Sequence, residues 1–224
     1  MSFNIAIDGP AGAGKSTIAR QLAQRLGFIY VDTGAMYRAM ACHLLREKID
    51  PGDREKIEEA CRHADITISY ENGSQQVLLN GENVTERLRE ETVGNMASLV
   101  SSYPVVREKL TQLQKKLARS ADVVMDGRDI GTAVLPHAQV KIYLTASTAV
   151  RAGRRYEELK AKGIEKDLKD IEKDIEERDY RDMNREISPL CQAEDAVLLD
   201  TSDMDIKTVL ESAVRICREK SKAL

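Results

Sequence analysis

The stretch that decides the fold is Gly9-Pro10-Ala11-Gly12-Ala13-Gly14-Lys15-Ser16-Thr17, which matches the spacing G-x-x-x-x-G-K-[ST]. An apolar run from Phe3 to Ile7 precedes it, and a helical pattern from Ile18 to Leu26 comes after it. The motif alone occurs by chance in glycine-rich loops. The order of strand, loop and helix, however, is the one that a phosphate-binding loop requires, so the stretch predicts a nucleoside triphosphate site.

The chemistry of this loop derives from its residue types. Glycines allow a tight turn in which successive N–H groups point at a polyphosphate, and the helix N-terminus adds partial positive charge. Lys15 is expected to bridge the β- and γ-phosphates. The Ser16 hydroxyl is expected to ligate Mg²⁺, a cation that prefers oxygen. We therefore expect ATP to contact the whole loop, Gly9 to Thr17, with Mg²⁺ as the cofactor.

Composition limits the classes of function. The chain has 224 residues, 32% of them charged, and a net charge of −3, which shows neither a basic nucleic-acid footprint nor an acidic tail. The first residues are already an expected strand, and no apolar run approaches the ~18–20 residues that span a membrane. The four cysteines are widely spaced and are expected to be reduced thiols. We expect a soluble, cytoplasmic monomer that binds small molecules and neither nucleic acid nor membrane.

The order of the expected elements indicates an α/β fold with a doubly wound, five-stranded parallel sheet, because strands alternate with helices. Ligands of such sheets bind at the carboxyl ends of the strands. The expected strands are Asn4–Asp8, Phe28–Val31, Asp122–Met125, Gln139–Leu144 and Ala196–Leu199, and the expected helices are Lys15–Leu26, Gly34–Lys48, Pro104–Arg119 and Asp205–Lys220.

Two segments break this alternation. Ile66–Tyr70, the turn Glu71-Asn72-Gly73-Ser74, Gln76–Leu79 and Glu82–Val84 are typical of a small antiparallel unit, inserted at about 62–100. The segment Arg151–Arg185 is densely charged and poor in apolar residues, which indicates either a solvated helical face or a mobile flap.

Charged residues come directly after the expected strand that ends near Met125. Asp126 stands where P-loop proteins place a Mg²⁺-directed acid, and the glycine-flanked pair Arg128 and Asp129 lies just beyond it. Further along, Arg178, Arg181, Asp182 and Arg185 are spaced to share one helix face. Either group could be structural, since arginine–aspartate pairs are common in turns and on exposed helices.

A second group of anion-binding candidates comes earlier in the chain. Thr33 and the N–H groups around it open a helix, and Arg38 lies one turn further on. Arg107 lies near the start of the helix at Pro104. One triphosphate held by a P-loop does not need so many arginines. Their number predicts a second anionic substrate that faces the γ-phosphate.

With these residues in view, the chain resembles the bacterial cytidylate kinases of the nucleoside monophosphate kinase superfamily. The resemblance runs from about residue 3 to 220. It rests on Ile7–Thr17, Asp32–Arg38, Tyr103–Arg107, Asp126–Thr132 and Glu177–Arg185, of which the last two are specific to the family.

The resemblance implies ATP-dependent phosphorylation of CMP and dCMP, with Lys15, Arg128 and Asp129 as the catalytic residues. The lid arginines Arg151, Arg154 and Arg155 are implied to close on the ATP phosphates, and we favour Arg154 as an ATP contact. It also implies contacts to CMP from Thr33, Arg38, Arg107, Arg128, Asp129, Arg178, Asp182 and Arg185.

The domain organisation implied by the resemblance has a P-loop core at 1–61 and 101–224, a lid at about 151–170, and a monophosphate-binding lobe at 62–100. Two alternatives stay open. One is a P-loop kinase of another monophosphate or a metabolite, against which the inserted lobe and Asp126–Asp129 argue. The other is a GTPase switch or an ATP-driven nucleic-acid machine, but the chain has no N-K-x-D motif for guanine and no basic groove.

Overall fold

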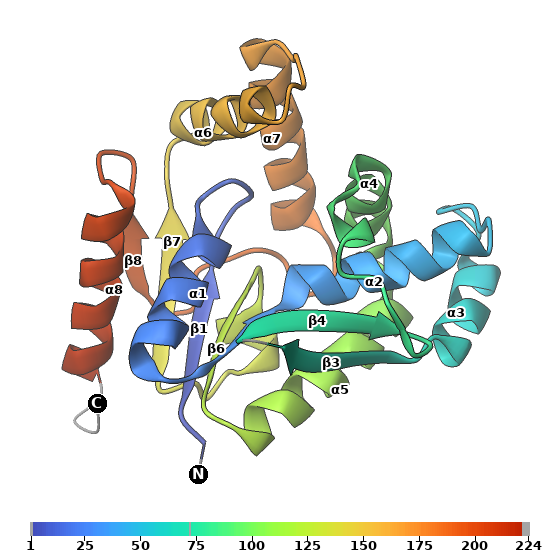
Figure 1. Cartoon of the computed structure of the whole chain (residues 1–224), viewed down its shortest axis with the longest axis horizontal. Helices are drawn as coiled ribbons and strands as arrows, with labels where there is room; N and C mark the ends of the chain where they lie inside the picture. Colours follow the sequence, from blue (N-terminus) through green and yellow to red (C-terminus); the bar gives the residue numbers. More distant parts are fainter. Residues whose placement is uncertain (1, 72, 221–224) are drawn as a thin grey trace. The chain divides into compact units, whose positions relative to one another are not determined.

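The computed structural model describes residues 2–71 and 73–220 (Figure 1). It divides into two compact units, which we call the P-loop unit (Met1–Tyr30 and Ala118–Leu224) and the second unit (Val31–Leu117). No helix in the described ranges is long and apolar enough to cross a membrane.

The main sheet has the five predicted strands, in the order β2-β6-β1-β7-β8. They are β1 (Asn4–Asp8), β2 (Ile29–Asp32), β6 (Val123–Gly127), β7 (Val140–Thr145) and β8 (Val197–Asp200). β1 pairs in parallel with β6 and β7, and β7 pairs in parallel with β8. The carboxyl ends of β1 and β6 therefore meet, since Asp8 lies opposite Gly127.

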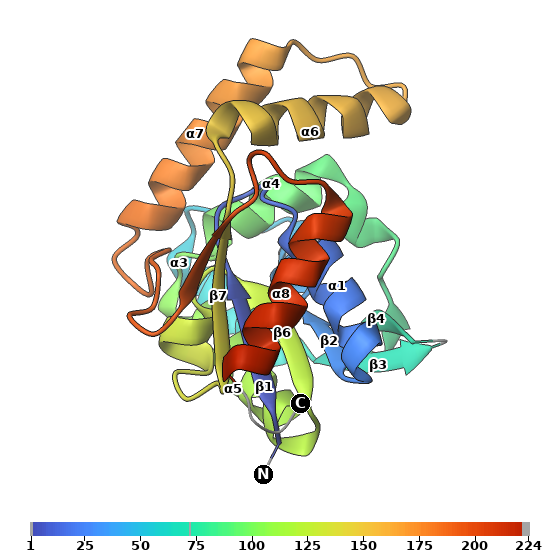
Figure 2. The same cartoon turned by 90° about the vertical axis from the view of Figure 1, so that its left-hand side faces the viewer.

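The core of the P-loop unit lies between the sheet and two helices. α1 (Lys15–Leu26) and α8 (Ile206–Lys220) lie on one face of the strands (Figure 2). Ile5, Leu22 and Ile142 are buried in the cluster that these elements form. α1 has the predicted bounds because a glycine with left-handed backbone stands at each end, Gly14 before its first residue and Gly27 after its last.

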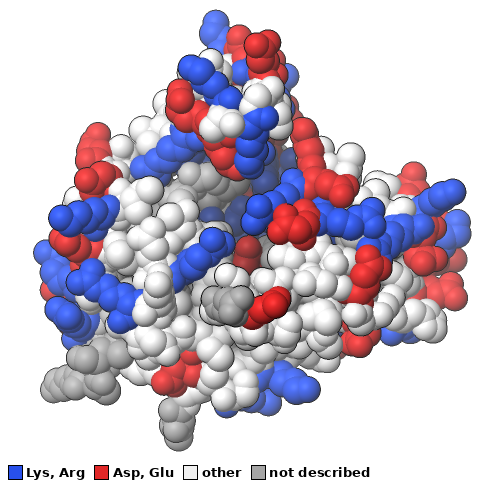
Figure 3. Space-filling model, viewed as in Figure 1, with Lys and Arg blue, Asp and Glu red and all other residues white. Residues whose placement is uncertain are grey.

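The charged segment forms two helices, α6 (Thr148–Ala161) and α7 (Leu168–Asn184), which lie side by side (Figures 1 and 2). They enclose a small apolar cluster of their own, including Leu159 and Ile171. Positive and negative side chains alternate over their surface (Figure 3). The two helices with a charged surface agree with the solvated helical face that was one of the two expectations, whereas the apolar cluster was not expected in a segment so poor in apolar residues.

The second unit surrounds a three-stranded antiparallel sheet of order β3-β4-β5, which confirms the predicted β lobe. The turn at Glu71-Asn72-Gly73-Ser74 includes Asn72, which lies outside the described residues. The elements of this unit are α2 (Thr33–Arg46), α3 (Arg54–His63), β3 (Ile66–Glu71), β4 (Ser74–Leu79), β5 (Glu82–Asn83), the 3₁₀ turn η1 (Arg87–Arg89), α4 (Glu91–Val100) and α5 (Pro104–Ser120).

The compact unit is wider than the lobe expected at 62–100. α2 packs on α3, on α4 and on the strands of the small sheet, so it groups with them and not with the P-loop. Burial of Met36, Met40 and Leu44 on α2 accompanies this packing. The expected limits at 62 and 100 therefore do not coincide with those of the unit.

Candidate active site

The P-loop connects β1 to α1 in a conformation that needs glycine. Gly9 has a φ of +149°, and a Cβ there would collide with the Leu144 carbonyl oxygen on β7. Gly14 has a φ of +88° and precedes the first residue of α1. The loop thus ends at a helix N-terminus, whose free N–H groups attract anions.

Lys15 is the first residue of α1 and is only 6% exposed. Its Nζ donates to the Pro10 carbonyl oxygen at 2.7 Å. Burial lowers the pKa of Lys15 well below its usual value, and the charge of Arg128 lowers it further, while Asp126 opposes the shift. A polyphosphate in the loop would supply the negative charge that favours the ammonium.

Ser16 is paired with the acid near the end of β6. Its hydroxyl donates to Asp126 Oδ2 at 2.8 Å, and the Tyr30 hydroxyl donates to Oδ1 at 2.9 Å. Asp126 is 4% exposed. A hydroxyl and a carboxylate give an all-oxygen donor set, which fits the preference of Mg²⁺.

Asp8 is a residue of this site that the sequence analysis left without a role. Its two carboxylate oxygens accept the N–H groups of Ile130 and Gly131, both at 2.7 Å. Burial raises the pKa of Asp8 to about 6, although these two hydrogen bonds oppose the shift. Asp8 thereby fixes the segment after Asp129, which makes a single π-helical turn from Ile130 to Val134.

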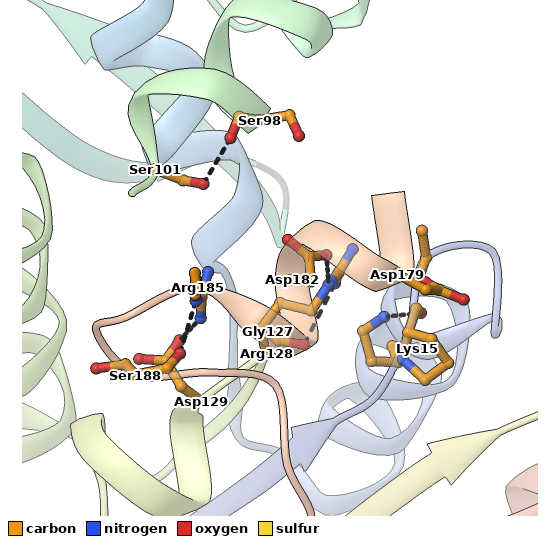
Figure 4. A network of polar contacts seen from close by, with 12 residues as sticks. Lys15, Ser98, Ser101, Gly127, Arg128, Asp129, Asp179, Asp182, Arg185 and Ser188 are labelled. Carbon is orange, nitrogen blue, oxygen red and sulfur yellow. Dashed lines mark hydrogen bonds and ion pairs between the residues drawn. The ribbon is translucent and has the colours of Figure 1, made fainter. Parts of the chain in front are cut away.

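Two arginine–aspartate pairs connect this segment to the region of α7 (Figure 4). Arg128 Nε donates to Asp182 Oδ2 at 2.9 Å. The Arg185 guanidinium donates to Asp129 Oδ1 at 3.4 Å and to the Ser188 carbonyl oxygen at 2.7 Å. Burial alone would raise the pKa of Asp182, but the hydrogen bond from Arg128 and the positive charges of Arg128, Arg178 and Arg185 together hold this pKa below its usual value.

The predicted arginine face of this helix is only partly right. Arg178 lies close enough to Lys15 and Asp182 to influence the pKa of both. Arg181 is exposed, because the buried face of α7 includes Asp179 and Asp182. α7 also ends at Asn184, so Arg185 has an extended backbone and is not part of the helix.

Arg151 has a different environment from the one implied for a lid arginine. It is buried, and it donates to Asp179 at 2.6 Å and to the carbonyl oxygens of Ala11 and Ala146, both at 2.9 Å. Asp179 also accepts the N–H of Ala11 at 3.4 Å. These two residues therefore hold the P-loop backbone, and neither role is visible from sequence spacing.

The two other lid arginines also have protein partners. Arg154 donates to the hydroxyl and the carbonyl oxygen of Thr201 at 3.2 and 2.8 Å. Arg155 pairs with Glu158 at the surface.

The start of α2 carries the first residues of the second unit that were predicted to bind an anionic substrate. The Asp32 side chain caps the helix by accepting the Ala35 N–H at 2.9 Å. The main-chain N–H and carbonyl of Asp32 are both bonded to the Gln75 side chain of β4, at 2.8 and 3.2 Å. Thr33 is the next residue and is buried.

Arg107 and Arg38 are the two other residues of the second unit that were predicted to bind an anionic substrate. Arg107 is 4% exposed, donates to the Ser101 carbonyl oxygen at 3.2 Å and lies over the Tyr37 ring. Arg38 is half-buried, and among residues 2–71 and 73–220 its side chain forms no hydrogen bond or ion pair. Buried or half-buried arginines are costly without an anion or an acceptor nearby.

Glycines with positive φ beside a buried lysine, between β1 and α1, have the geometry of a P-loop. The parallel sheet and this loop place the protein among the P-loop proteins. The cytidylate kinase family model matches residues 5–219. The chain belongs to the cytidylate kinase family.

Curated members of this family align with the chain over nearly their full length. The chain is 50% identical to a cytidylate kinase of Caldicellulosiruptor bescii, over 96% of this chain and 95% of that one. It is 49% identical to a cytidylate kinase of Lactobacillus johnsonii, over 98% and 96% of the two chains. With a cytidylate kinase of Enterococcus faecalis the identity is 46%, over 97% and 96%.

Solved structures resemble the fold at low sequence identity. An uncharacterized protein from Eubacterium ventriosum has a TM-score of 0.53 at 12% identity, over 96% of this chain and 97% of that one. The protein TT1252 from Thermus thermophilus has a TM-score of 0.52 at 16% identity, over 98% and 97%. These similarities concern the fold alone.

Proposed function

We propose that this protein transfers the γ-phosphoryl group of ATP to CMP and dCMP, with formation of ADP and of CDP or dCDP. Membership of the cytidylate kinase family supports this reaction. The structural observation that carries it is the group of arginines near Lys15. Arg128 and Arg178 both lie close enough to Lys15 to lower its pKa, so guanidinium groups that can bind a second phosphate stand beside the P-loop lysine.

On the donor side, the backbone of Gly9–Thr17 holds the phosphates and Lys15 neutralises their charge. Arg154 on α6 is proposed as a further contact to ATP. Mg²⁺, when bound, supplies a Lewis acid to the β- and γ-phosphates, and Ser16 with Asp126 would hold it.

On the acceptor side, the arginines bind the α-phosphate and the polar residues recognise the base and the sugar. Recognition of cytosine by matched donors and acceptors disfavours uracil, because a mismatch leaves buried groups unpaired. The residues proposed to bind CMP are Thr33, Arg38, Arg107, Arg128, Asp129, Arg178, Asp182 and Arg185.

The reaction needs no general base. An α-phosphate oxygen of CMP, already an anion, forms the new bond to the γ-phosphorus as the bond from that phosphorus to the β-phosphate bridging oxygen breaks. Lys15 and Arg128, together with Asp129, are the catalytic residues, and they act by positioning and charge neutralisation. Exclusion of water by the lid at about 151–170 would prevent loss of ATP to hydrolysis.

The segment 62–100 is proposed as part of the monophosphate-binding lobe. We expect a cytoplasmic monomer that acts on small nucleotides and does not bind nucleic acid or membranes.

The test is release of ADP with ATP, Mg²⁺ and one acceptor at a time from CMP, dCMP, UMP, AMP and GMP. We expect turnover with CMP and dCMP far above the others. Comparable rates with UMP would contradict the account of base recognition. Slow hydrolysis without any dependence on an acceptor would instead favour a nucleotide-driven switch.

A matched pair of variants tests the arginine group. Arg128→Ala should lose turnover by at least about 100-fold, the usual effect of removing one transition-state charge contact. Arg215→Ala on α8 removes an exposed arginine of the same unit and should keep wild-type kinetics. Unchanged kinetics in folded Arg128→Ala would exclude the proposed role.

A further inference from the structure

The side chain of Gln75 binds both main-chain groups of one residue. Its Oε1 accepts the Asp32 N–H at 2.8 Å, and its Nε2 donates to the Asp32 carbonyl oxygen at 3.2 Å. A primary amide has one acceptor and one donor side, so it reproduces the two hydrogen bonds that a neighbouring strand residue would make. We call this arrangement the Gln75 clamp.

The clamp lies where the main chain lacks a strand partner. Asp32 is the last residue of β2, and β2 is the edge strand of the five-stranded sheet. Edge strands leave N–H and C=O groups unpaired, and an unpaired group that is shielded from water is costly. Gln75 satisfies both groups from β4 of the small sheet, 43 residues further along the chain.

The orientation of Asp32 controls the start of α2. The Asp32 side chain caps α2 at the Ala35 N–H, and buried Thr33 is the first residue of that helix. The clamp fixes the peptide groups on both sides of the Asp32 Cα atom. It therefore fixes the direction in which α2 begins and, with it, the Thr33 hydroxyl and N–H.

We infer that Gln75 is a positioning residue for acceptor recognition, which holds Thr33 in the geometry that selects cytosine. This inference rests on the proposed function. Its consequence is that the small antiparallel sheet contributes to base selection through the main chain of Asp32, and the Gln75 side chain need not touch the nucleotide.

The neighbouring residue provides a matched control. Successive strand residues point to opposite faces, so Gln76 points away from the clamp. Its Oε1 accepts a hydrogen bond from Asn83 Nδ2 on β5, at 3.0 Å, within the small sheet. Gln76→Ala thus removes an amide from the same strand but leaves α2 unaffected.

The experiment compares steady-state kinetics of wild type, Gln75→Ala and Gln76→Ala with CMP and with UMP. Gln75→Ala should raise KM for CMP roughly tenfold, as expected for the loss of two net hydrogen bonds, with KM for ATP changed less than about twofold. The preference for CMP over UMP should fall with it. Gln76→Ala should match wild type in all three values.

A second variant gives a readout that a merely structural role would not move. In Gln75→Glu an ionised carboxylate cannot donate to the Asp32 carbonyl oxygen, whereas a neutral carboxyl can. The Asp32 carbonyl oxygen favours the neutral form of this carboxyl and so raises its pKa above the usual value for glutamate. KM for CMP, relative to wild type at the same pH, should therefore fall as the pH decreases from 8 to about 4. The same ratio for Gln75→Ala should stay constant. Thermal melts followed by circular dichroism confirm that each variant is folded.

The outcomes separate the two proposals. An active wild type with equal KM values for Gln75→Ala and Gln76→Ala would overturn the inference alone. Equal losses in KM for CMP and for ATP would also overturn it, because they indicate a general structural effect. A wild type without turnover on CMP would overturn the proposed function, and the role of the clamp with it.

Discussion

Replacing Arg151 by methionine tests how strongly the helices α6 and α7 hold the P-loop. Methionine keeps most of the apolar stem but removes the guanidinium. The Arg151 and Asp179 side chains are 5% and 12% exposed, and their closest atoms are 2.6 Å apart. The change leaves the Asp179 carboxylate buried without its cation, and it leaves the Ala11 and Ala146 carbonyl oxygens without this donor.

The expected cost is about 3–5 kcal/mol, which is typical when one partner of a buried ion pair is removed. For a chain of this length, each kcal/mol lowers Tm by roughly 2–4 °C. The variant should therefore melt about 6–20 °C below wild type. Urea unfolding followed by circular dichroism gives the free energy of unfolding directly.

The control is Arg155→Met on the same helix. Arg155 and Glu158 are 45% and 50% exposed, so their ion pair should contribute less than about 1 kcal/mol. The double variant Arg151→Met with Asp179→Leu should be more stable than Arg151→Met alone, because no uncompensated charge remains. A loss below about 1 kcal/mol for Arg151→Met, or one equal to the control, would refute the reasoning.

Three further predictions concern the P-loop and its neighbours. Lys15→Met should reduce kcat for ADP release at least about 100-fold, and activity above a tenth of wild type would contradict this. The change should not lower Tm, because burial already disfavours the charged form of the lysine. Asp8 has a pKa raised from 3.8 to about 6, so its contribution to stability is complete below about pH 4 and is lost as the pH rises through about 6. The free energy of unfolding of Asp8→Asn, relative to wild type, should thus increase by up to about 3 kcal/mol between pH 4 and 7 in urea titrations, and a constant difference would exclude the shift. Ser16→Ala should raise the Mg²⁺ concentration for half-maximal activity severalfold, and an unchanged Mg²⁺ dependence would remove Ser16 from the metal site.

The sequence predicted those parts of the fold that local signals specify. The bounds of α1 are set by glycines at both of its ends, and the cap at Asp32 is a residue type that favours helix starts. α3 and α4 were missed. In α3, only Ile57, Ala60 and Cys61 are buried among charged residues, so its apolar pattern is short. In α4, no side chain caps the N-terminus.

The residues of the candidate site also fall into two groups, those that the sequence predicted and those that it did not. Lys15 and the pair Arg128 and Asp129 stand in motifs that the sequence displays. The supporting residues do not, because their roles depend on partners far along the chain. Asp8 binds main-chain groups 122 and 123 residues away, and Asp179 binds Ala11 at a separation of 168.

The placement of β1 at the centre of the sheet has a consequence for the order of folding during synthesis. β1 is the first strand made, yet its partners β6 and β7 begin at Val123 and Val140. The second unit, by contrast, is one continuous segment, Val31–Leu117, and is complete before either partner of β1 exists. A nascent chain therefore exposes an apolar strand on both edges for over a hundred residues of synthesis, and the P-loop that follows this strand is supported on both sides only after β6 and β7 have been made.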